Sequence, residues 1–202
     1  MCGERRDSEI KLAQRVLSRL FNEKSGKEVL IGLKAIVCAD QNWGIGNQGH
    51  LLVNIPSDMK FFRDTTIGHV VVMGRRTFDG LPGRRPLEDR VNIVLSRDAK
   101  FHPAGVIVVR GKKELFEELK KYDADEIFII GGTSVYELML PYCDEVLVTK
   151  VDFAYQADCY FPNLDYMPEW ELAEESEEQT CFDIEFVFRK YRRKYHTAFP
   201  EI

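Results

Sequence analysis

Short apolar runs alternate along this chain with segments whose apolar residues have helical spacing. The runs are rich in valine and isoleucine, which favour strands, and glycine, proline or polar residues bound them. They predict strands at residues 29–39, 70–73, 91–96, 106–109, 126–130, 145–151, 170–175 and 181–191. Apolar residues three and four positions apart, together with helix-start signals, predict helices at residues 57–66, 75–80, 112–122 and 134–140.

Helices between buried strands imply right-handed crossovers and a mostly parallel sheet. The last two strands have no helix between them, so we expect a C-terminal antiparallel hairpin at one edge. The predicted fold class is therefore α/β: a single domain with a mostly parallel eight-stranded central sheet, this hairpin and flanking helices. The domain is expected at residues 29–192, with a C-terminal tail at 193–202.

Residues 1–28 have a different pattern and form an N-terminal extension. Apolar residues recur there at near-helical spacing among charges, at Ile10, Val16, Leu17, Leu20 and Phe21. This spacing predicts an amphipathic helix that ends at the Ser25-Gly26 pair. A frayed extension is the alternative interpretation.

Composition narrows the class of protein. With 202 residues, of which 45% are hydrophobic and 30% charged, the chain suits one soluble domain. No apolar run approaches the roughly 20 residues that span a bilayer, and the charged N-terminus does not resemble a secretory signal. We therefore expect a cytoplasmic protein without a membrane partner. The net charge of −5 gives no reason to expect nucleic acid.

Five scattered cysteines argue against a metal site or a disulfide framework. Their number is odd and they form no CxxC pair; they are Cys2, Cys38, Cys143, Cys159 and Cys181.

Three strand ends carry residues suited to a ligand, because open α/β sheets bind ligands beyond the carboxyl ends of their strands. The segment after the strand at 126–130 reads Gly131, Gly132, Thr133, Ser134, Val135, Tyr136. Glycines let the backbone approach a ligand closely, and the free N–H groups of a helix start attract anions. A tight strand–helix turn with a hydroxyl cap is the alternative.

The other two strand ends are rich in arginine. They carry Gly74, Arg75, Arg76 and Thr77 after one strand, and Ser96 and Arg97 after the next. Cations in a first helical turn oppose the helix dipole, so this placement indicates an anion. If the two strands are neighbours, the cluster fits a phosphate monoester such as the 2′-phosphate of NADP. Solvated surface arginines are the alternative, and no G-x-G-x-x-G follows the first strand.

Asp58 is a candidate for recognition of a flat heterocycle. It lies in the first turn of the helix at 57–66, and Phe62 at i+4 shares its face. A carboxylate beside an aromatic wall can accept two parallel hydrogen bonds from an N–C–NH2 edge. Burial would raise its pKa and a cationic ring would lower it. The alternative is a solvated acid favoured by the helix dipole.

Six stretches, in this order and spacing, resemble the dihydrofolate reductase family over about residues 30–191. They are ADQNWGIG at 39–46, IPSDMKFF at 55–62, VMGRRT at 72–77, RVNIVLS at 90–96, IIGG at 129–132, and the segment from TKV at 149–151 through Asp158 to Phe161-Pro162. The resemblance implies an NADPH-dependent oxidoreductase that reduces dihydrofolate to tetrahydrofolate for one-carbon metabolism. It also implies a monomer that binds antifolate inhibitors.

The resemblance implies substrate roles residue by residue. Asp58 would be the catalytic acid that binds the pterin N3 and 2-amino edge, Thr149 would support it, and Arg90 would pair with the α-carboxylate of the glutamyl tail. The other substrate-binding positions would be Ile36, Val37, Phe62, Leu81, Leu87, Ile130 and Tyr136.

Cofactor roles follow in the same way. Cys38, Ile45, Gly46, Gly49 and Leu51 would surround the nicotinamide; Gly74, Arg75, Arg76, Thr77, Ser96 and Arg97 would hold the adenosine and its phosphate, with Arg110 beside the adenine; and Ile130, Gly131, Gly132, Thr133, Ser134, Val135 and Tyr136 would line the pyrophosphate. No metal is implied. The loop at 44–53 would close over the nicotinamide and exclude water, and a water would deliver the proton to N5 of the substrate.

The chain departs from the family pattern at two site positions. Val53 stands where the family commonly has tryptophan, which puts an ordered water in doubt, and Thr133 replaces a frequent third glycine. Two other functions remain open at this point. One is a reductase of the same fold that acts on a pyrimidine of riboflavin synthesis, and the other is a non-catalytic nucleotide-binding module.

Overall fold

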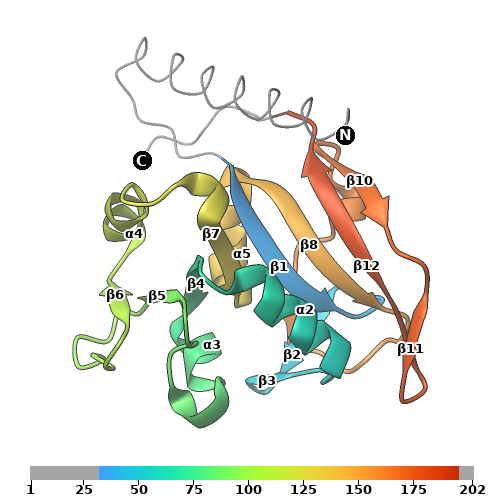
Figure 1. The fold of residues 1–202 in the computed structure, drawn as a ribbon, viewed down its shortest axis with the longest axis horizontal. Coiled ribbons are helices and arrows are strands. Elements are labelled where there is room, and N and C mark those ends of the chain that lie inside the picture. Colours follow the sequence, from blue (N-terminus) through green and yellow to red (C-terminus); the bar gives the residue numbers. More distant parts are fainter. Residues whose placement is uncertain (1–31, 196–202) are drawn as a thin grey trace. The chain divides into compact units, whose positions relative to one another are not determined.

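The structure is a computed structural model and describes residues 32–195. The helix expected at 1–28 and residues 196–202 of the expected tail lie outside the described residues. The central sheet consists of β1 (Leu33–Ala39), β4 (Val70–Gly74), β5 (Val91–Leu95), β6 (Ile107–Val109), β7 (Ile127–Gly131), β8 (Cys143–Val151), β10 (Trp170–Glu175), β11 (Gln179–Cys181) and β12 (Ile184–Arg193). Eight of these strands form one path in the order β10-β12-β8-β1-β7-β4-β5-β6 (Figure 1).

The pairing within this path confirms the predicted fold class. All neighbours from β8 to β6 are parallel. At the other end, β12 pairs antiparallel with both β8 and β10. The carboxyl ends of the parallel strands therefore lie along one edge of the sheet, which is the lower edge in Figure 1.

The four described α-helices follow the predicted positions closely. They are α2 (Pro56–Thr66), α3 (Arg75–Asp79), α4 (Lys112–Leu119) and α5 (Thr133–Met139), and short 3₁₀ helices η1 (Pro82–Arg84), η2 (Ala124–Glu126), η3 (Leu140–Tyr142) and η4 (Leu164–Tyr166) link other elements. In Figure 1, α2 crosses in front of the sheet and α5 lies behind it. Pro56 suits the first position of α2, where no backbone N–H is needed, and Gly68 at φ 79° follows its end.

A small second sheet was not predicted. It has the order β3-β2-β9, with β2 (Gly44–Asn47), β3 (His50–Leu51) and β9 (Cys159–Tyr160). Strands of two to four residues are too short to show an apolar alternation, so no pattern in these segments predicts a strand. Gln48 and Gly49 both have positive φ, as a two-residue hairpin turn between β2 and β3 requires.

The predicted strand at 181–191 was wrong at its start. The chain turns at Phe182 and Asp183, which both have positive φ, so Cys181 belongs to β11 and β12 begins at Ile184. The apolar alternation continues through this turn, because Phe182 is apolar although it is 84% exposed. β12 extends to Arg193, whose guanidinium donates to the carbonyls of Cys143 and Leu140.

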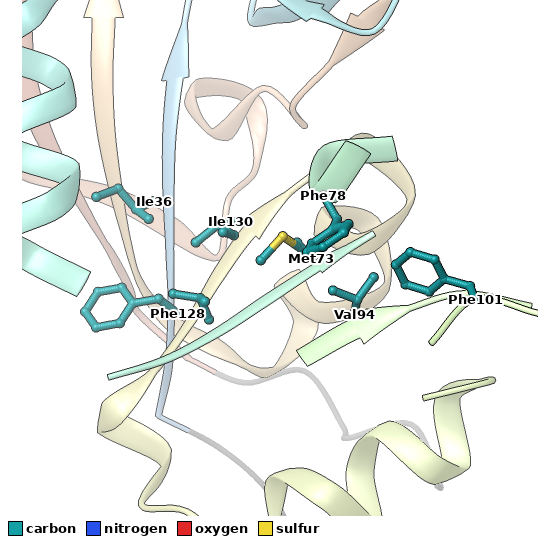
Figure 2. Packing of buried hydrophobic residues seen from close by; sticks show 8 residues of the cluster. Ile36, Met73, Phe78, Val94, Phe101, Phe128 and Ile130 are labelled. Carbon is teal, nitrogen blue, oxygen red and sulfur yellow. The ribbon is translucent and has the colours of Figure 1, made fainter. Parts of the chain in front are cut away.

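The main core cluster lies between the central strands and α3, and Figure 2 shows its packing. Its buried members are Ile36, Val71, Met73, Phe78, Val94, Phe101, Phe128 and Ile130. Phe62, Leu81 and Leu87 pack against this cluster while only partly buried. The core therefore continues into a partly exposed apolar wall beneath α2.

Within residues 32–195, no helix combines the length and apolar character needed to cross a membrane. In the same part of the chain, no three or more His, Cys, Asp or Glu side chains are grouped closely enough to hold a metal ion.

Candidate active site

Asp58 is directed toward the sheet and not into bulk solvent. The hydroxyl of Thr149, at the end of β8, donates a 2.6 Å hydrogen bond to its Oδ1. Thr149 is 2% exposed and Asp58 is half-buried. Burial raises the pKa of the Asp58 carboxyl, and the Thr149 hydrogen bond opposes this rise because it favours the charged form. The structure thus brings the predicted acid and its supporting hydroxyl together.

Removal of the Thr149 hydroxyl should shift the acid limb of activity. In Thr149→Val, the carboxylate loses the hydrogen bond that favours its charged form, so the pKa of Asp58 rises further. Activity that depends on ionised Asp58 should then be lost at a higher pH than in the wild type. The measurement is the pH profile of kcat/KM, with Thr149→Ser as the variant that should restore the wild-type limb. An unchanged limb in Thr149→Val would contradict the pairing.

The predicted substrate walls also meet in the structure. Phe62 from α2 and Leu81 and Leu87 from the segment around η1 pack on the cluster that contains Ile36 and Ile130. Tyr136 is 3% exposed, and its hydroxyl donates a 2.7 Å hydrogen bond to the carbonyl of Ile36. Val37 follows Ile36 on β1, so its side chain points to the opposite face and only its backbone faces this wall.

Tyr136→Phe tests the link between β1 and α5. The substitution leaves the buried Ile36 carbonyl without this partner, which should cost about 1–3 kcal/mol of the free energy of unfolding. Chemical denaturation of both proteins gives this difference. A loss below about 0.5 kcal/mol would show that the Ile36 carbonyl finds another partner.

Arg90 lies at the outer end of this wall. Its Nε donates to Thr66 Oγ1 at 2.8 Å, and its two terminal nitrogens donate to the carbonyls of Glu88 and Arg63. The guanidinium carbon is 5.9 Å from the centre of the Phe62 ring. These contacts fix the orientation of a cation beside the predicted benzoyl wall, at the far end of α2 from Asp58.

The three strand ends that the sequence singled out for a ligand are adjacent in space. Strand β4 lies between β7 and β5 in the sheet. Its residue Met73 pairs with Gly131 of β7 on one side and with Val94 of β5 on the other. Side chains would not fit between the first two turns: a Cβ on Gly74 would lie 3.2 Å from Val135 Cγ2, and one on Gly131, at φ 119°, 3.2 Å from the Tyr136 ring. The glycines therefore let the turns after β4 and β7 pack closely against each other and against α5.

The arginines near these turns have different partners. Arg75 stacks 3.9 Å from the centre of the Phe101 ring and pairs with Asp79 at 2.7 Å and with Asp98 at 3.3 Å. Arg76 and Arg97 are exposed, and Ser96 Oγ accepts from the N–H of Asp98. Arg110 donates to the backbone carbonyls of Ser96, Asp98 and Phe101. Arg110 thus braces the segment after β5, a role that the sequence did not suggest.

The remaining predicted cofactor residues surround the end of β1 and the start of α5. Cys38, Ile45 and Leu51 line one narrow cavity together with Val53, and burial raises the pKa of the Cys38 thiol. A Cβ on Gly46 would lie only 3.0 Å from the carbonyl oxygen of His50, so a side chain would be crowded there. A Cβ on Gly49 would have no atom within 4 Å. At the start of α5, the hydroxyl of Thr133 donates to the carbonyl of Tyr160, and Ser134 is exposed. The hydroxyl oxygen of Thr77 would lie 3.4 Å from a Cβ on Gly132.

Two acids near the loop at 44–53 escaped the sequence analysis as site residues. Asp158 Oδ2 accepts from the N–H of Gln48 and its own N–H donates to the carbonyl of Gly46. Asp40 is 2% exposed and accepts three backbone N–H groups, from Asn42, Gly44 and Tyr155. The available signal was an acid near a glycine-rich segment, which is too common to single out either residue.

A mostly parallel sheet with glycine-lined strand ends, and a threonine-bound acid above it, defines the class of small α/β reductases that use a nicotinamide dinucleotide. The sequence model of dihydrofolate reductase matches residues 32–193. The chain belongs to the dihydrofolate reductase family.

Individual relatives agree with this assignment. The dihydrofolate reductase of Heliothis virescens is 32% identical over 81% of this chain and 98% of its own length, and that of Haemophilus influenzae is 35% identical over 75% and 94%. Among solved structures, dihydrofolate reductase from Enterococcus faecalis, complexed with NADP(H) and RAB-propyl, superposes with a TM-score of 0.72. It is 30% identical in sequence, and the match covers 83% of this chain and 99% of that one.

Proposed function

We propose that this protein is a dihydrofolate reductase that uses NADPH to reduce 7,8-dihydrofolate to tetrahydrofolate, with the ionised carboxylate of Asp58 as its catalytic group. The observation that carries the proposal is the Asp58–Thr149 pair, a half-buried carboxylate held at 2.6 Å by a buried hydroxyl beside the Phe62 wall. Burial disfavours the charged form of Asp58, so the position costs free energy when no ligand is bound. A cationic pterin would offset that cost.

The residues at the strand ends fit NADPH. The turns at Gly74 and Gly131–Gly132 would offer backbone N–H groups to a pyrophosphate, and Arg75 and Arg97 would supply cations for the 2′-phosphate. When bound, NADPH supplies the hydride. Cys38, Ile45 and Leu51 surround the cavity at the end of β1, where the nicotinamide would be shielded from water.

Each protein group then has one task in the reaction. Ionised Asp58 accepts hydrogen bonds from N3 and the 2-amino group and favours the cationic, N5-protonated ring by its charge. N5 lies on the other ring of the pterin, so water delivers its proton. Phe62, Leu81 and Leu87 orient the ring and the benzoyl group, and Arg90 binds the glutamyl α-carboxylate at the outer end.

An absorbance assay at 340 nm with NADPH and dihydrofolate tests the proposal directly. We expect turnover that is inhibited by methotrexate at stoichiometric concentration. NADPH oxidation with a pyrimidine substrate of riboflavin synthesis, but not with dihydrofolate, would favour the other reductase; no turnover with either would favour a nucleotide-binding module.

The proposal extends to the state and place in which the protein works. We propose that the protein works as a monomer, and light scattering of the purified protein measures its mass. The reaction needs NADPH and folates, so we place the protein in the cytoplasm; fractionation of cells followed by immunodetection checks this.

A further inference from the structure

Trp43 lies at the root of the loop at 44–53 and is enclosed by aromatic rings. Trp43 is 2% exposed. The centre of its ring lies 6.0 Å from that of Phe161, with the two rings stacked, and 5.8 Å from that of Tyr191, with the two rings tilted. The Nζ of Lys150 lies 4.5 Å from the ring centre, which is a close cation–π distance. Trp43 has φ 63°, so the chain reverses sharply at this residue.

Lys150 also binds the backbone of the same turn. Its Nζ donates to the carbonyl of Asp40 at 2.5 Å and to that of Gln41 at 3.0 Å. Two carbonyls and one aromatic face therefore converge on a single ammonium group. Lys150 is the residue after Thr149 on β8, and successive side chains of a strand point to opposite faces. β8 thus holds Asp58 on one face of the sheet and this turn on the other.

The turn is rigid enough to transmit this position to the loop. Asp40 Oδ1 accepts from the N–H groups of Asn42 and Gly44, and Oδ2 accepts from Tyr155. Gly44 is the first residue of β2, and a Cβ there would lie 2.8 Å from that of Ala157. A displacement of the turn therefore moves β2, whose Ile45 lines the cavity at the end of β1.

We infer that Lys150 is a positioning residue for the reductase, which fixes the Asp40–Trp43 turn and thereby the loop at 44–53 over the reacting carbons. The inference rests on the proposed function. Lys150 lies on the opposite face of β8 from Thr149 and Asp58, so its effect should appear in the alignment of the reactants and not in the binding of the pterin.

The charges around Lys150 give the inference a pH signature. Asp165 from η4, Arg189 from β12 and Asp40 at the end of β1 act on the ammonium group. Burial lowers the pKa of Lys150 to about 8, and Arg189 lowers it while Asp165 and Asp40 raise it. Above that pH the neutral amine loses its cation–π contact and the charge assistance of its hydrogen bonds. Wild-type kcat should therefore fall about threefold as the pH rises through about 8.

Three variants test the inference. Lys150→Met replaces the lysine by an unbranched apolar side chain and so removes the positive charge and the hydrogen-bond donors. Lys150→Arg keeps the charge and the donors. Lys34→Met is the matched control, because Lys34 is another strand lysine over an aromatic ring, 5.3 Å from Phe128, but on β1 away from the loop. Rates are normalised to active sites titrated with methotrexate, so that partial misfolding does not lower the measured kcat.

We expect Lys150→Met to lower kcat about tenfold, with the KM for dihydrofolate within about twofold of the wild type. Lys150→Arg should recover to within about threefold and lose the fall near pH 8, since a guanidinium stays charged. Equal kcat in Lys150→Met and the wild type, or an equal loss in Lys34→Met, would overturn the inference. So would a fall in kcat near pH 8 that is as large in Lys150→Arg as in the wild type, since the loss of N5 protonation at high pH is common to both proteins.

Hydrogen exchange separates this inference from the proposed function. The amides of Asn42, Gly44 and Tyr155 should exchange faster in Lys150→Met than in the wild type, but not in Lys150→Arg or Lys34→Met. This result stands even if dihydrofolate is not the substrate. Unchanged exchange of these amides would show that Lys150 does not hold the turn, whatever the protein reduces.

Discussion

Asp58→Asn should lower kcat/KM for dihydrofolate about 10²- to 10³-fold at pH 7. Asparagine can still accept the Thr149 hydrogen bond and keeps the shape of the side chain, but it carries no charge to favour an N5-protonated ring. Affinity for NADPH should change less than about twofold, because Asp58 lies above the sheet and not at the glycine-lined strand ends. Steady-state kinetics and fluorescence titration with NADPH measure the two effects.

The same substitution should not destabilise the fold. The folded-state pKa of Asp58 is raised by burial, so between the unfolded and folded pKa values the native state binds more protons than the unfolded state. Its contribution to stability therefore falls as the pH rises through that window, and at neutral pH the protein holds a poorly solvated charge. Asp58→Asn removes this cost, and its melting temperature at pH 7 should equal or exceed that of the wild type.

Asp64→Asn is the matched control for this experiment. Asp64 lies on the same helix but pairs with Lys60 at the surface, where the hydrogen bond from Lys60 lowers its pKa. Its replacement should leave turnover unchanged. Comparable losses in Asp58→Asn and Asp64→Asn, or near-normal turnover in Asp58→Asn, would remove the acid from the mechanism.

Arg75→Ala combined with Arg97→Ala should reduce the preference for NADPH over NADH about a hundredfold. Arg75 is held in place by Asp79, Asp98 and the Phe101 ring, so its guanidinium is oriented before a phosphate binds. NADH has no 2′-phosphate, and its kcat/KM should change less than about threefold. The measurement is the ratio of kcat/KM for the two cofactors.

Arg192→Ala serves as the control, because Arg192 is an exposed cation on β12, far along the sheet from β4 and β5. Arg192→Ala removes one positive charge, as each substitution of the double variant does, but leaves the ends of β4 and β5 unchanged. An unchanged NADPH preference in the double variant would place the 2′-phosphate elsewhere. An equal change in Arg192→Ala would attribute the effect to overall charge.

The apolar pattern was sufficient to predict most of the sheet. The strands at β4, β5 and β7 are continuous buried runs, and a segment that is apolar on both sides has few places to go except the centre of a parallel sheet. The pattern did not predict strands that are held by backbone hydrogen bonds alone and bury no row of apolar side chains. The sheet β3-β2-β9 forms through two- and four-residue strands whose hydrogen bonds leave no periodicity in the side chains.

The sequence indicated candidate site residues where the chemistry is local. Two arginines at a helix start indicate an anion from their position alone, and the glycine pair indicates a close approach of the backbone. Contacts with distant partners gave no such signal: the hydrogen bonds of Arg110 to carbonyls 9–14 residues away in sequence could not be predicted from its neighbours.

By itself, the sequence determined the helices and most strands of the central sheet, because each depends on a pattern within a few neighbouring residues. It also indicated the family, through six short stretches in the family's order, and singled out Asp58 as the candidate acid. Only the tertiary structure decided which way Asp58 faces, since Thr149 is 91 residues away in sequence and meets it only when β8 lies beneath α2. The same holds for Lys150 and the Asp40–Trp43 turn, separated by 110 residues in sequence. Contacts between such distant residues form when the sheet brings them together, and no local pattern records them.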